Sequence, residues 1–371
     1  MSETGKRPQP RPFLEQLAPY VGGRERVEGV ENPHKLSANE NPLGPSAKAI
    51  EALQDLSRLE IYPDGSSKVL RAAIGKQFNL NADRIICGNG SDEIFHLLAQ
   101  AYLQPGDETI CTRHSFLVYR LVTEAAGGNT LMVQENNLTA DVDAILAAVT
   151  EKTKIVFIAN PNNPTGTVIS KSEIRRLHAG LRSDIIFLID GAYAEYVTDN
   201  IYDDAYDLVN ESENVVVTRT FSKAYGLASL RLGWGYFPTR VADILNRTRA
   251  PFNINSLASN AGMAALADQE HIRETVAHNV QWRNWCTQQI NALGIEVLPS
   301  EANFILLRFK SEVMAQDADD FLCQKGVILR ALGAYGLPEC LRMTIGTQQA
   351  NRDAVTALTA FIETYTESTE G

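Results

Sequence analysis

The sequence predicts an α/β fold: a mostly parallel central sheet flanked by helices, with a smaller α+β domain. Between residues 84 and 237, short runs rich in β-branched residues alternate with helical stretches, which is typical of a parallel sheet covered by helices. Several of these runs are apolar on consecutive residues, as strands buried on both faces are. The chain has 371 residues, of which 44% are hydrophobic, and this is enough for a large core and a second, smaller one.

Six segments are predicted to be strands of the central sheet, and they lie at residues 84–88, 108–111, 130–133, 154–159, 184–190 and 214–220. A long helical region from about 256 to 292 then leads to the smaller domain. Four further strands are predicted there, at residues 296–298, 304–309, 327–330 and 341–345. We therefore expect an N-terminal tail and arm (1–35), a large domain (36–265), and a small domain (266–371) packed with the N-terminal segment.

The composition narrows the class of partners. The net charge of −11 argues against nucleic acid or an anionic membrane as the main partner. No apolar run approaches the roughly 20 residues of a membrane span, and residues 1–12 lack the apolar core of a signal peptide. The five cysteines show no Cys-x-x-Cys spacing and are expected to be reduced, buried thiols of a cytoplasmic protein.

One group of residues has the spacing of a metal site. His271, Glu274 and His278 are three and four residues apart on a predicted helix and would share a face. Charged neighbours favour a solvated helix face instead, so no metal site is expected.

Lys223 is a residue whose position is hard to explain by a purely structural role. It lies between the predicted strand 214–220 and the small apolar stretch 224–230. Desolvation there lowers the pKa of a lysine toward the neutral amine, which attacks carbonyls and forms Schiff bases. Ser222 and Arg231 add donors suited to a phosphate, so the three residues indicate a phosphorylated carbonyl cofactor. A Ser-Lys hydrolase is disfavoured, because adjacent residues of an extended segment point to opposite faces.

The ends of two other predicted strands supply further candidates, because ligands bind beyond the carboxyl ends of the strands in open parallel sheets. Asp190 ends an apolar strand, where a carboxylate needs a donor or a cation such as a protonated pyridine nitrogen. A helix cap is the alternative interpretation. Asn163 lies in a proline-rich loop after strand 154–159 and offers an amide donor to a ligand oxygen.

A tight turn is predicted at Gly88-Asn-Gly-Ser-Asp-Glu93, before a helical stretch. The backbone amides of Ser91 and Asp92 at the helix start suit a phosphate. Glu93 stands where a dinucleotide fingerprint has its third glycine. A turn with Ser91 or Asp92 as the helix N-cap is the structural interpretation, and it is compatible with a bound phosphate.

Together, these segments resemble the fold-type I aminotransferases that use pyridoxal phosphate, over nearly the whole chain. The resemblance implies that Lys223 carries the Schiff base to the cofactor and that Asp190 keeps the pyridine nitrogen protonated. It also implies that Asn163 and Tyr193 bind the phenolic oxygen of the ring and that Phe116 stacks on the ring. The residues implied for the cofactor phosphate are Ser91, Asp92, Ser222, Arg231 and, from the partner subunit of a homodimer, Tyr62.

Three more segments resemble the histidinol-phosphate aminotransferase family, namely 19–24, 38–44 and 249–255. That resemblance implies transamination between L-histidinol phosphate and 2-oxoglutarate, giving imidazole acetol phosphate and L-glutamate, in histidine biosynthesis. The implied substrate-binding residues are Tyr20, Asn39, Arg330 and Arg342, with Arg342 also serving the carboxylate of the amino acceptor. Read without the family, the two arginines lie in apolar strands where a guanidinium needs an anion, and structural ion pairs are the alternative.

Two departures from the family pattern leave the substrate open. Ser115 and Phe116 stand where many members have Thr-Tyr, and Gly22-Gly23 replaces a more usual Pro-Gly. An aromatic amino-acid aminotransferase is therefore an alternative, and a phosphoamino-acid decarboxylase of similar fold is a second one. A regulatory cofactor sensor is disfavoured, because the roughly 30 residues before the fold contain no helix-turn-helix pattern.

Overall fold

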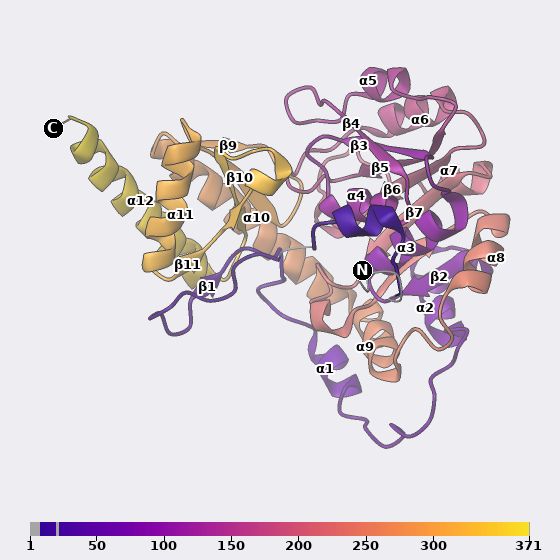
Figure 1. Cartoon of the computed structure of the whole chain (residues 1–371). Coiled ribbons are helices and arrows are strands. Elements are labelled where there is room, and N and C mark those ends of the chain that lie inside the picture. The colour runs from indigo at the N-terminus through magenta and orange to yellow at the C-terminus, as the bar shows by residue number, and fades with distance from the viewer. Residues whose placement is uncertain (1–7, 20–21, 371) are drawn as a thin grey trace, which may run out of the picture.

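The computed structural model describes residues 8–19 and 22–370, and it contains a large and a small unit (Figure 1). The large unit is built on a seven-stranded sheet and the small one on a four-stranded sheet, counted over the described residues. Helix α10 (Gln269–Ala292) leads from the large unit into the small one (Figure 1). The predicted fold class is confirmed, whereas the domain limits at residues 36 and 266 stay a prediction.

The central sheet has the strand order β2-β8-β7-β6-β5-β3-β4. Strand β8 is antiparallel to both of its neighbours, and the other pairs are parallel. The six predicted strands are confirmed to within two residues, but β8 was missed because two of its four residues are glycine, which is depleted from strands. The strands are β2 Ile85–Gly88, β3 Glu108–Thr112, β4 Asn129–Val133, β5 Thr153–Ala159, β6 Ile186–Asp190, β7 Val215–Thr220 and β8 Gly233–Tyr236.

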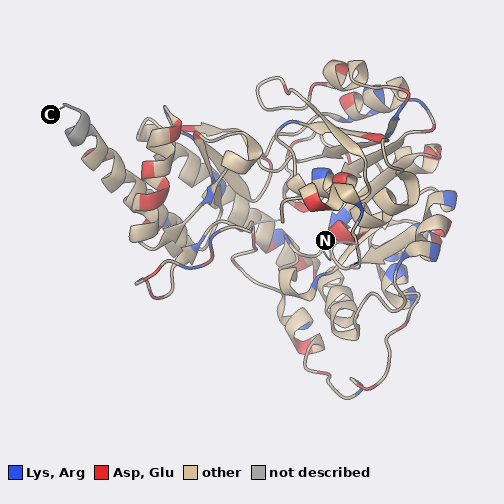
Figure 2. Ribbon diagram, in the orientation of Figure 1, with Lys and Arg blue, Asp and Glu red and all other residues tan. Residues whose placement is uncertain are grey.

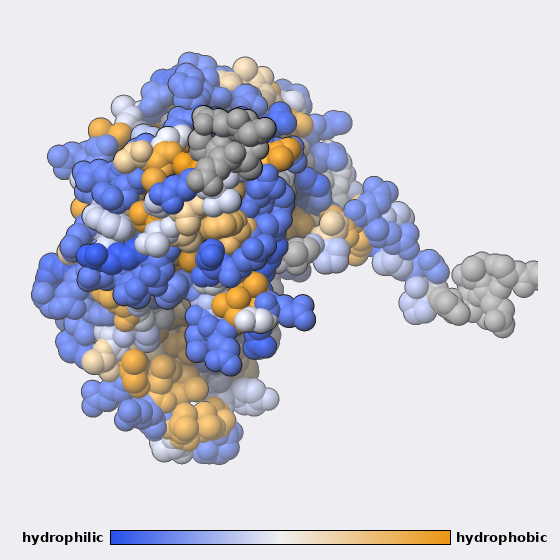
Figure 3. Space-filling view, turned by 90° about the vertical axis from the view of Figure 1, so that its left-hand side faces the viewer, coloured by the Kyte–Doolittle hydropathy of each residue, from blue (hydrophilic) through white to orange (hydrophobic). Residues whose placement is uncertain are grey.

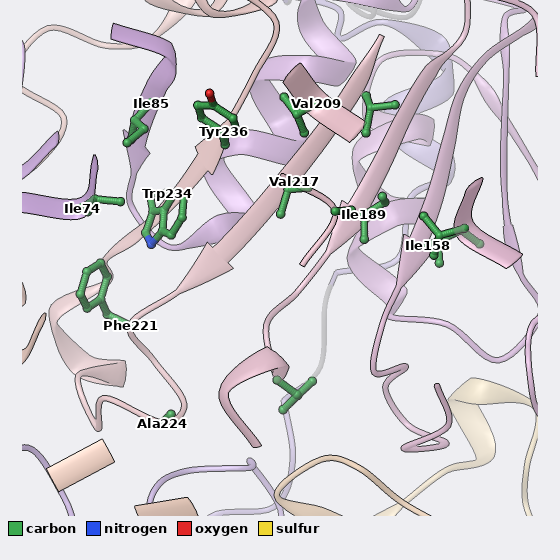
Figure 4. Packing of buried hydrophobic residues seen from close by; sticks show 14 of the residues in the cluster. Ile74, Ile85, Ile158, Ile189, Val209, Val217, Phe221, Ala224, Trp234 and Tyr236 are labelled. Atoms are coloured by element: carbon green, nitrogen blue, oxygen red, sulfur yellow. The ribbon is translucent and has the colours of Figure 1, made fainter. Parts of the chain in front are cut away.

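Helices cover both faces of this sheet, because successive strand residues point to opposite sides. On one face, Ile158, Ile189, Val217 and Trp234 pack in a single buried cluster (Figure 4). Among the helices that contribute to this cluster are α2 Lys68–Phe78, α5 Val142–Ala147, α6 Lys171–Gly180, α7 Tyr206–Glu211 and α9 Ser256–Leu266. On the other face the helices are α3 Ser91–Tyr102, α4 Leu117–Ala125 and α8 Thr239–Thr248.

The small unit is an antiparallel sheet of order β12-β13-β10-β9, covered by α10, α11 (Glu312–Gln324) and α12 (Gln348–Glu370). Its strands are β9 Glu296–Leu298, β10 Phe304–Arg308, β12 Arg330–Ala331 and β13 Cys340–Thr344. The N-terminal strand β1 (His34–Lys35) pairs in parallel with β11 (Val327–Ile328), so the N-terminal segment contacts the small unit. The remaining elements are α1 Ala47–Ala52 and short 3-10 helices at Pro12–Gln16, Ala82–Arg84, Ala194–Tyr196, Ala228–Leu230 and Gly333–Tyr335.

Two predicted elements of this region differ from the structure. The long helical region at 256–292 is two helices, α9 and α10, which are interrupted at residues 267–268. The single strand predicted at 327–330 is divided between β11, which pairs with β1, and β12, which pairs with β13. Local periodicity cannot show that one extended segment serves two sheets.

His271 and His278, two of the three residues with the spacing of a metal site, lie on α10 and contact two loops. The ring nitrogen Nε2 of His271 lies 3.0 Å from the Gly44 carbonyl oxygen, and that of His278 lies 2.9 Å from the Gly346 carbonyl oxygen. Both histidines are half-buried and Glu274 is exposed, so the face is partly solvated, and each histidine also makes a hydrogen bond to a neighbouring loop. A search of the described residues finds no group of three or more His, Cys, Asp or Glu that is placed to hold a metal ion.

The remaining expectations concern the surface and the cysteines. Acidic and basic residues are interspersed over the helices (Figure 2). All five cysteines are free and buried. Among the described residues, none of the helices has the length and apolar character needed to span a membrane.

Candidate active site

A cavity of about 370 Å³ lies where β5, β6 and β7 end, and residues of the small unit line it as well. The strand ends Ala159, Asp190 and Thr220 are part of its wall, as the rule for open parallel sheets predicts. The cavity brings together twelve of the predicted site residues, which come from both sheets and from the N-terminal segment. They are Asn39, Ser91, Asp92, Phe116, Asn163, Asp190, Tyr193, Ser222, Lys223, Arg231, Arg330 and Arg342.

Asp190 is a buried carboxylate at the last position of β6. Its two oxygens accept hydrogen bonds from the Tyr119 hydroxyl, at 2.6 Å, and from the Thr218 hydroxyl, at 3.1 Å. Burial raises the pKa of Asp190 to about 6, although both hydrogen bonds favour the carboxylate. The alternative of a helix cap is wrong. A cation in the cavity would compensate this buried charge.

Sequence reasoning missed Tyr119 and Thr218 as partners of Asp190. Thr218 pairs with Asp190 in the parallel register of β6 and β7, so this neighbour follows once the strand register is known. Tyr119 reaches Asp190 from α4 across the sheet face, and its ring stacks on Phe157 with centroids 4.8 Å apart. This second contact depends on helix packing, and no local pattern signals it.

Lys223 lies just beyond β7, with its ammonium in the cavity. Its Nζ donates to the Ala38 carbonyl oxygen at 3.0 Å and lies 5.9 Å from the centre of the Tyr193 ring. Burial, and secondly the positive charge of Arg342, lower the pKa of Lys223 to about 8. The neutral amine is therefore far more populated near neutral pH than it is for an ordinary lysine.

The premise used against a Ser-Lys pair is wrong, because residues 221–225 form bends and a turn instead of an extended strand. Ser222 and Lys223 consequently line the same cavity. Their contacts nevertheless differ: the Ser222 hydroxyl accepts from Nη1 of Arg231 at 3.4 Å, whereas Lys223 donates to a backbone carbonyl. These contacts do not form a nucleophile and base pair.

The turn before α3 has Gly90 as its N-cap, so the prediction of Ser91 or Asp92 as the cap is wrong. Gly90 has a φ of +76°, a conformation that glycine adopts without strain, and a Cβ there would lie 2.4 Å from Nη2 of Arg231. Gly233 of β8 is equally constrained, since a Cβ would lie 2.4 Å from the Ser91 nitrogen. The two glycines thus let the start of α3, Arg231 and β8 approach one another closely.

This close approach creates a site suited to an anion. The start of α3 presents the amides of Ser91 and Asp92, and the Ser222 hydroxyl lies beside Arg231. Nη2 of Arg231 donates to the Asp92 carboxylate at 3.1 Å, so a bound phosphate would share this guanidinium with Asp92.

Arg342 lines the cavity and connects the two units. It is buried, and it donates to Oδ1 of Asn163 at 2.5 Å and to the Ser37 carbonyl oxygen at 2.7 Å. Arg330 is its direct cross-strand partner in the antiparallel pairing of β12 and β13. Asn39 donates to the Tyr193 hydroxyl at 2.9 Å, which ties the N-terminal segment to the loop after β6.

Two predicted residues are not among those that line the cavity. Tyr62 is outside the cavity, with 78% of its surface exposed, and its ring stacks on Phe252. Tyr20 lies outside the described residues. Phe116 lines the cavity with its ring edge-on to Tyr119, at 5.8 Å between centroids.

The donor set fits pyridoxal phosphate. The cavity combines a lysine of lowered pKa, a buried carboxylate that a cationic nitrogen would compensate, and an anion site at a helix start. These three features match the aldehyde, the pyridine nitrogen and the phosphate of that cofactor.

Comparison with known proteins identifies the family. Residues 31–358 match the model of the class I and II aminotransferases. The chain belongs to this family. A histidinol-phosphate aminotransferase of Rhodopseudomonas palustris (strain BisB18) is 50% identical over 360 residues, which cover 96% of this chain and 99% of that protein.

Two solved structures are similar in fold. One is the histidinol-phosphate aminotransferase of Sinorhizobium meliloti in complex with pyridoxal-5'-phosphate. Its TM-score is 0.90 at 23% identity, and the match covers 98% of this chain and 100% of that chain. The other is a putative histidinol-phosphate aminotransferase of Erwinia carotovora atroseptica, with a TM-score of 0.85 at 26% identity over 90% of this chain and 97% of that chain. The predictions of an aminotransferase and of pyridoxal phosphate as its cofactor are confirmed. The roles of individual residues stay predictions.

The lowered pKa of Lys223 predicts a characteristic pH dependence. In the full-length chain freed of cofactor, the rate at which an acylating reagent labels Lys223 should rise with pH and reach half its maximum near pH 8. The reason is that only the neutral amine reacts. Peptide mass spectrometry measures the labelling, with Lys223→Met to identify the peptide. A midpoint near the ordinary lysine value of 10.5 would contradict the desolvated environment.

Proposed function

We propose that the chain exchanges an amino group between L-histidinol phosphate and 2-oxoglutarate, giving imidazole acetol phosphate and L-glutamate in histidine biosynthesis. The observation that carries this proposal is that Arg330 and Arg342 line the same cavity as Lys223. The histidinol-phosphate aminotransferase of Rhodopseudomonas palustris, at 50% identity over nearly the full length of both chains, supports it.

The two arginines favour a substrate that carries a phosphate. Like charges placed directly opposite each other in a sheet destabilise it, so an anion close to Arg330 and Arg342 is favourable. A guanidinium can donate two parallel hydrogen bonds to the oxygens of either a phosphate or a carboxylate, in the same bidentate geometry. The pair therefore suits the phosphate of the amino donor in one half-reaction, and Arg342 suits the carboxylate of the amino acceptor in the other. Tyr20 is proposed to add a third contact to the substrate phosphate, and Asn39 is proposed to line the substrate site.

The chemistry assigns one task to each side chain around the cofactor. Pyridoxal phosphate, when bound, supplies an electron-poor ring that makes the α-proton of the substrate acidic. Asp190 holds the ring nitrogen protonated, and its burial strengthens that interaction. Asn163 and Tyr193 donate to the phenolic oxygen, and Phe116 covers the ring. Nζ of Lys223 accepts the α-proton and returns it, for which a pKa of about 8 is well matched to neutral pH.

The proposal includes a homodimer. In it, Tyr62 reaches the cofactor phosphate of the partner subunit, alongside Ser91, Asp92, Ser222 and Arg231 of that partner site. The support is a patch of exposed apolar side chains around Tyr62, which Figure 3 shows at the lower end of the molecule, where Figure 1 places the loop between α1 and α2. The patch contains Leu59, Ile61, Tyr62 and Phe252, which are exposed and line one surface hollow. We also propose the cytoplasm as the location, which agrees with five free cysteines and a biosynthetic role.

Replacement of Lys223 by alanine tests the catalytic assignment. The variant should have no measurable turnover, because the group that carries the proton is lost, and borohydride treatment should no longer fix the cofactor to the chain. Intact-mass measurement and a glutamate release assay provide both readouts. Lys325→Ala, in the loop after α11, is the matched control and should retain wild-type turnover. Turnover by the Lys223 variant would remove this residue from its proposed role.

Replacement of the two arginines tests the substrate assignment. Arg330→Gln should raise the KM for L-histidinol phosphate by about tenfold or more, as expected when a charge-assisted hydrogen bond is lost, and should affect 2-oxoglutarate much less. Arg342→Gln should raise the KM for both substrates. Steady-state kinetics measure this, with Arg247→Gln, an exposed position on α8, as the control. Equal effects of Arg330→Gln on both substrates would place the phosphate of the donor elsewhere.

A further inference from the structure

The segment 249–255 contacts two phosphate-binding elements, and the proposed function assigns it no role. Its Asn253 reaches the turn before α3: Nδ2 donates to the Cys87 carbonyl oxygen at 3.1 Å and to the Glu93 carboxylate at 2.8 Å. Asn89 returns a hydrogen bond to the Asn253 carbonyl oxygen at 2.7 Å. The same Glu93 oxygen accepts from the backbone nitrogen of Asn89 at 2.6 Å. Asn253 therefore braces the turn that presents the amides of Ser91 and Asp92.

The preceding residue, Phe252, contacts Tyr62 instead. The two rings are stacked, with centroids 4.8 Å apart and an angle of 22° between their planes. The Phe252 ring also covers Gly65 so closely that a Cβ on that glycine would lie 3.2 Å from two ring carbons. Phe252 thus packs against both ends of the turn at residues 62–65.

The backbone of Phe252 is held in an unfavourable conformation. Its φ is +55°, in the left-handed region. This conformation is unfavourable for a residue with a bulky side chain, and it persists only where the surrounding structure fixes it. The neighbouring hydrogen bonds of Asn253 supply such fixation. The result is a ring presented to Tyr62 in one direction.

The backbone beyond Tyr62 is fixed independently of this ring. Asp64 accepts hydrogen bonds from the backbone nitrogen of Ser66 at 2.9 Å and of Lys68 at 2.6 Å, which attaches the turn to the start of α2. These bonds hold the main chain but do not touch the Tyr62 side chain, most of which is exposed. The direction of the Tyr62 ring is therefore set by its stacking on Phe252.

We propose that Phe252 is a positioning residue for Tyr62, and that the segment 249–255 couples the phosphate sites of two subunits. This inference rests on the proposed function, in which Tyr62 donates to the cofactor phosphate of the partner subunit. Because residues 252 and 253 are adjacent, one segment orients the tyrosine offered to the partner cavity and braces the phosphate turn of its own cavity. A shift of the segment would change both sites together.

The affinities for pyridoxal phosphate and for pyridoxal, which lacks the phosphate, test this proposal. Equilibrium dialysis of the full-length chain gives both dissociation constants for the wild type, Phe252→Leu, Phe252→Tyr and Tyr62→Phe. Phe252→Leu should weaken binding of pyridoxal phosphate by about fivefold, the size of a lost aromatic pair, and should leave pyridoxal binding unchanged. Phe252→Tyr keeps the stack and should bind both as the wild type does. Phe252→Leu should add no further loss in a chain that already carries Tyr62→Phe.

The outcomes separate this inference from the function on which it rests. If Tyr62→Phe weakens pyridoxal phosphate binding but Phe252→Leu does not, the positioning role is wrong and the proposed function stands. If Phe252→Leu weakens both ligands equally, or adds fully to Tyr62→Phe, Phe252 acts on the fold and the positioning role is again wrong. If Tyr62→Phe has no effect on either ligand, the assignment of Tyr62 fails and the inference fails with it.

Discussion

Burial of the Asp190 carboxylate at the end of β6 is the constraint on which the rest of the site depends. The apolar strand β6 ends in this negative charge, and two hydroxyl donors do not offset the burial, since the pKa of Asp190 is still raised to about 6. A cationic ring nitrogen in the cavity would compensate that charge. The adjacent strand, β7, ends at Thr220, and Lys223 follows three residues later in the wall of the same cavity. One pair of strands thus positions both groups that the cofactor chemistry needs.

The substrate side of the cavity requires the two units to be held together. Arg342 belongs to the small sheet, yet its guanidinium binds Asn163 of the large unit and the carbonyl of Ser37 in the N-terminal segment. Strand β1 pairs with β11, which keeps that segment against the small unit. In the proposed function, binding of an anionic substrate therefore depends on contacts between the small sheet, the large unit and the N-terminal segment, whereas Asp190 and Lys223 are positioned by the central sheet.

Much of this could be predicted from the sequence. Apolar runs located six strands of the central sheet, and the rule that ligands bind beyond strand ends selected Asp190, Asn163 and Lys223. The strand β8 could not be predicted, because two of its four residues are glycine, which lowers the strand signal, and Gly233 is needed for the close approach to the start of α3. Nor could the bond from Tyr119 to Asp190, which joins residues 71 apart through helix packing on the sheet. Patterns along the chain reveal which groups end a strand, but contacts between distant elements follow only from the packed structure.

The central claim is that this cavity recognises an amino donor through its phosphate group. The most direct test is a single-turnover experiment in which the purified enzyme with bound cofactor is mixed with L-histidinol phosphate or with L-phenylalanine, while the visible absorbance of the cofactor is followed. The account predicts faster conversion with L-histidinol phosphate. Faster conversion with L-phenylalanine would preserve the cofactor chemistry and contradict the assignment of Arg330 and Arg342 to a substrate phosphate.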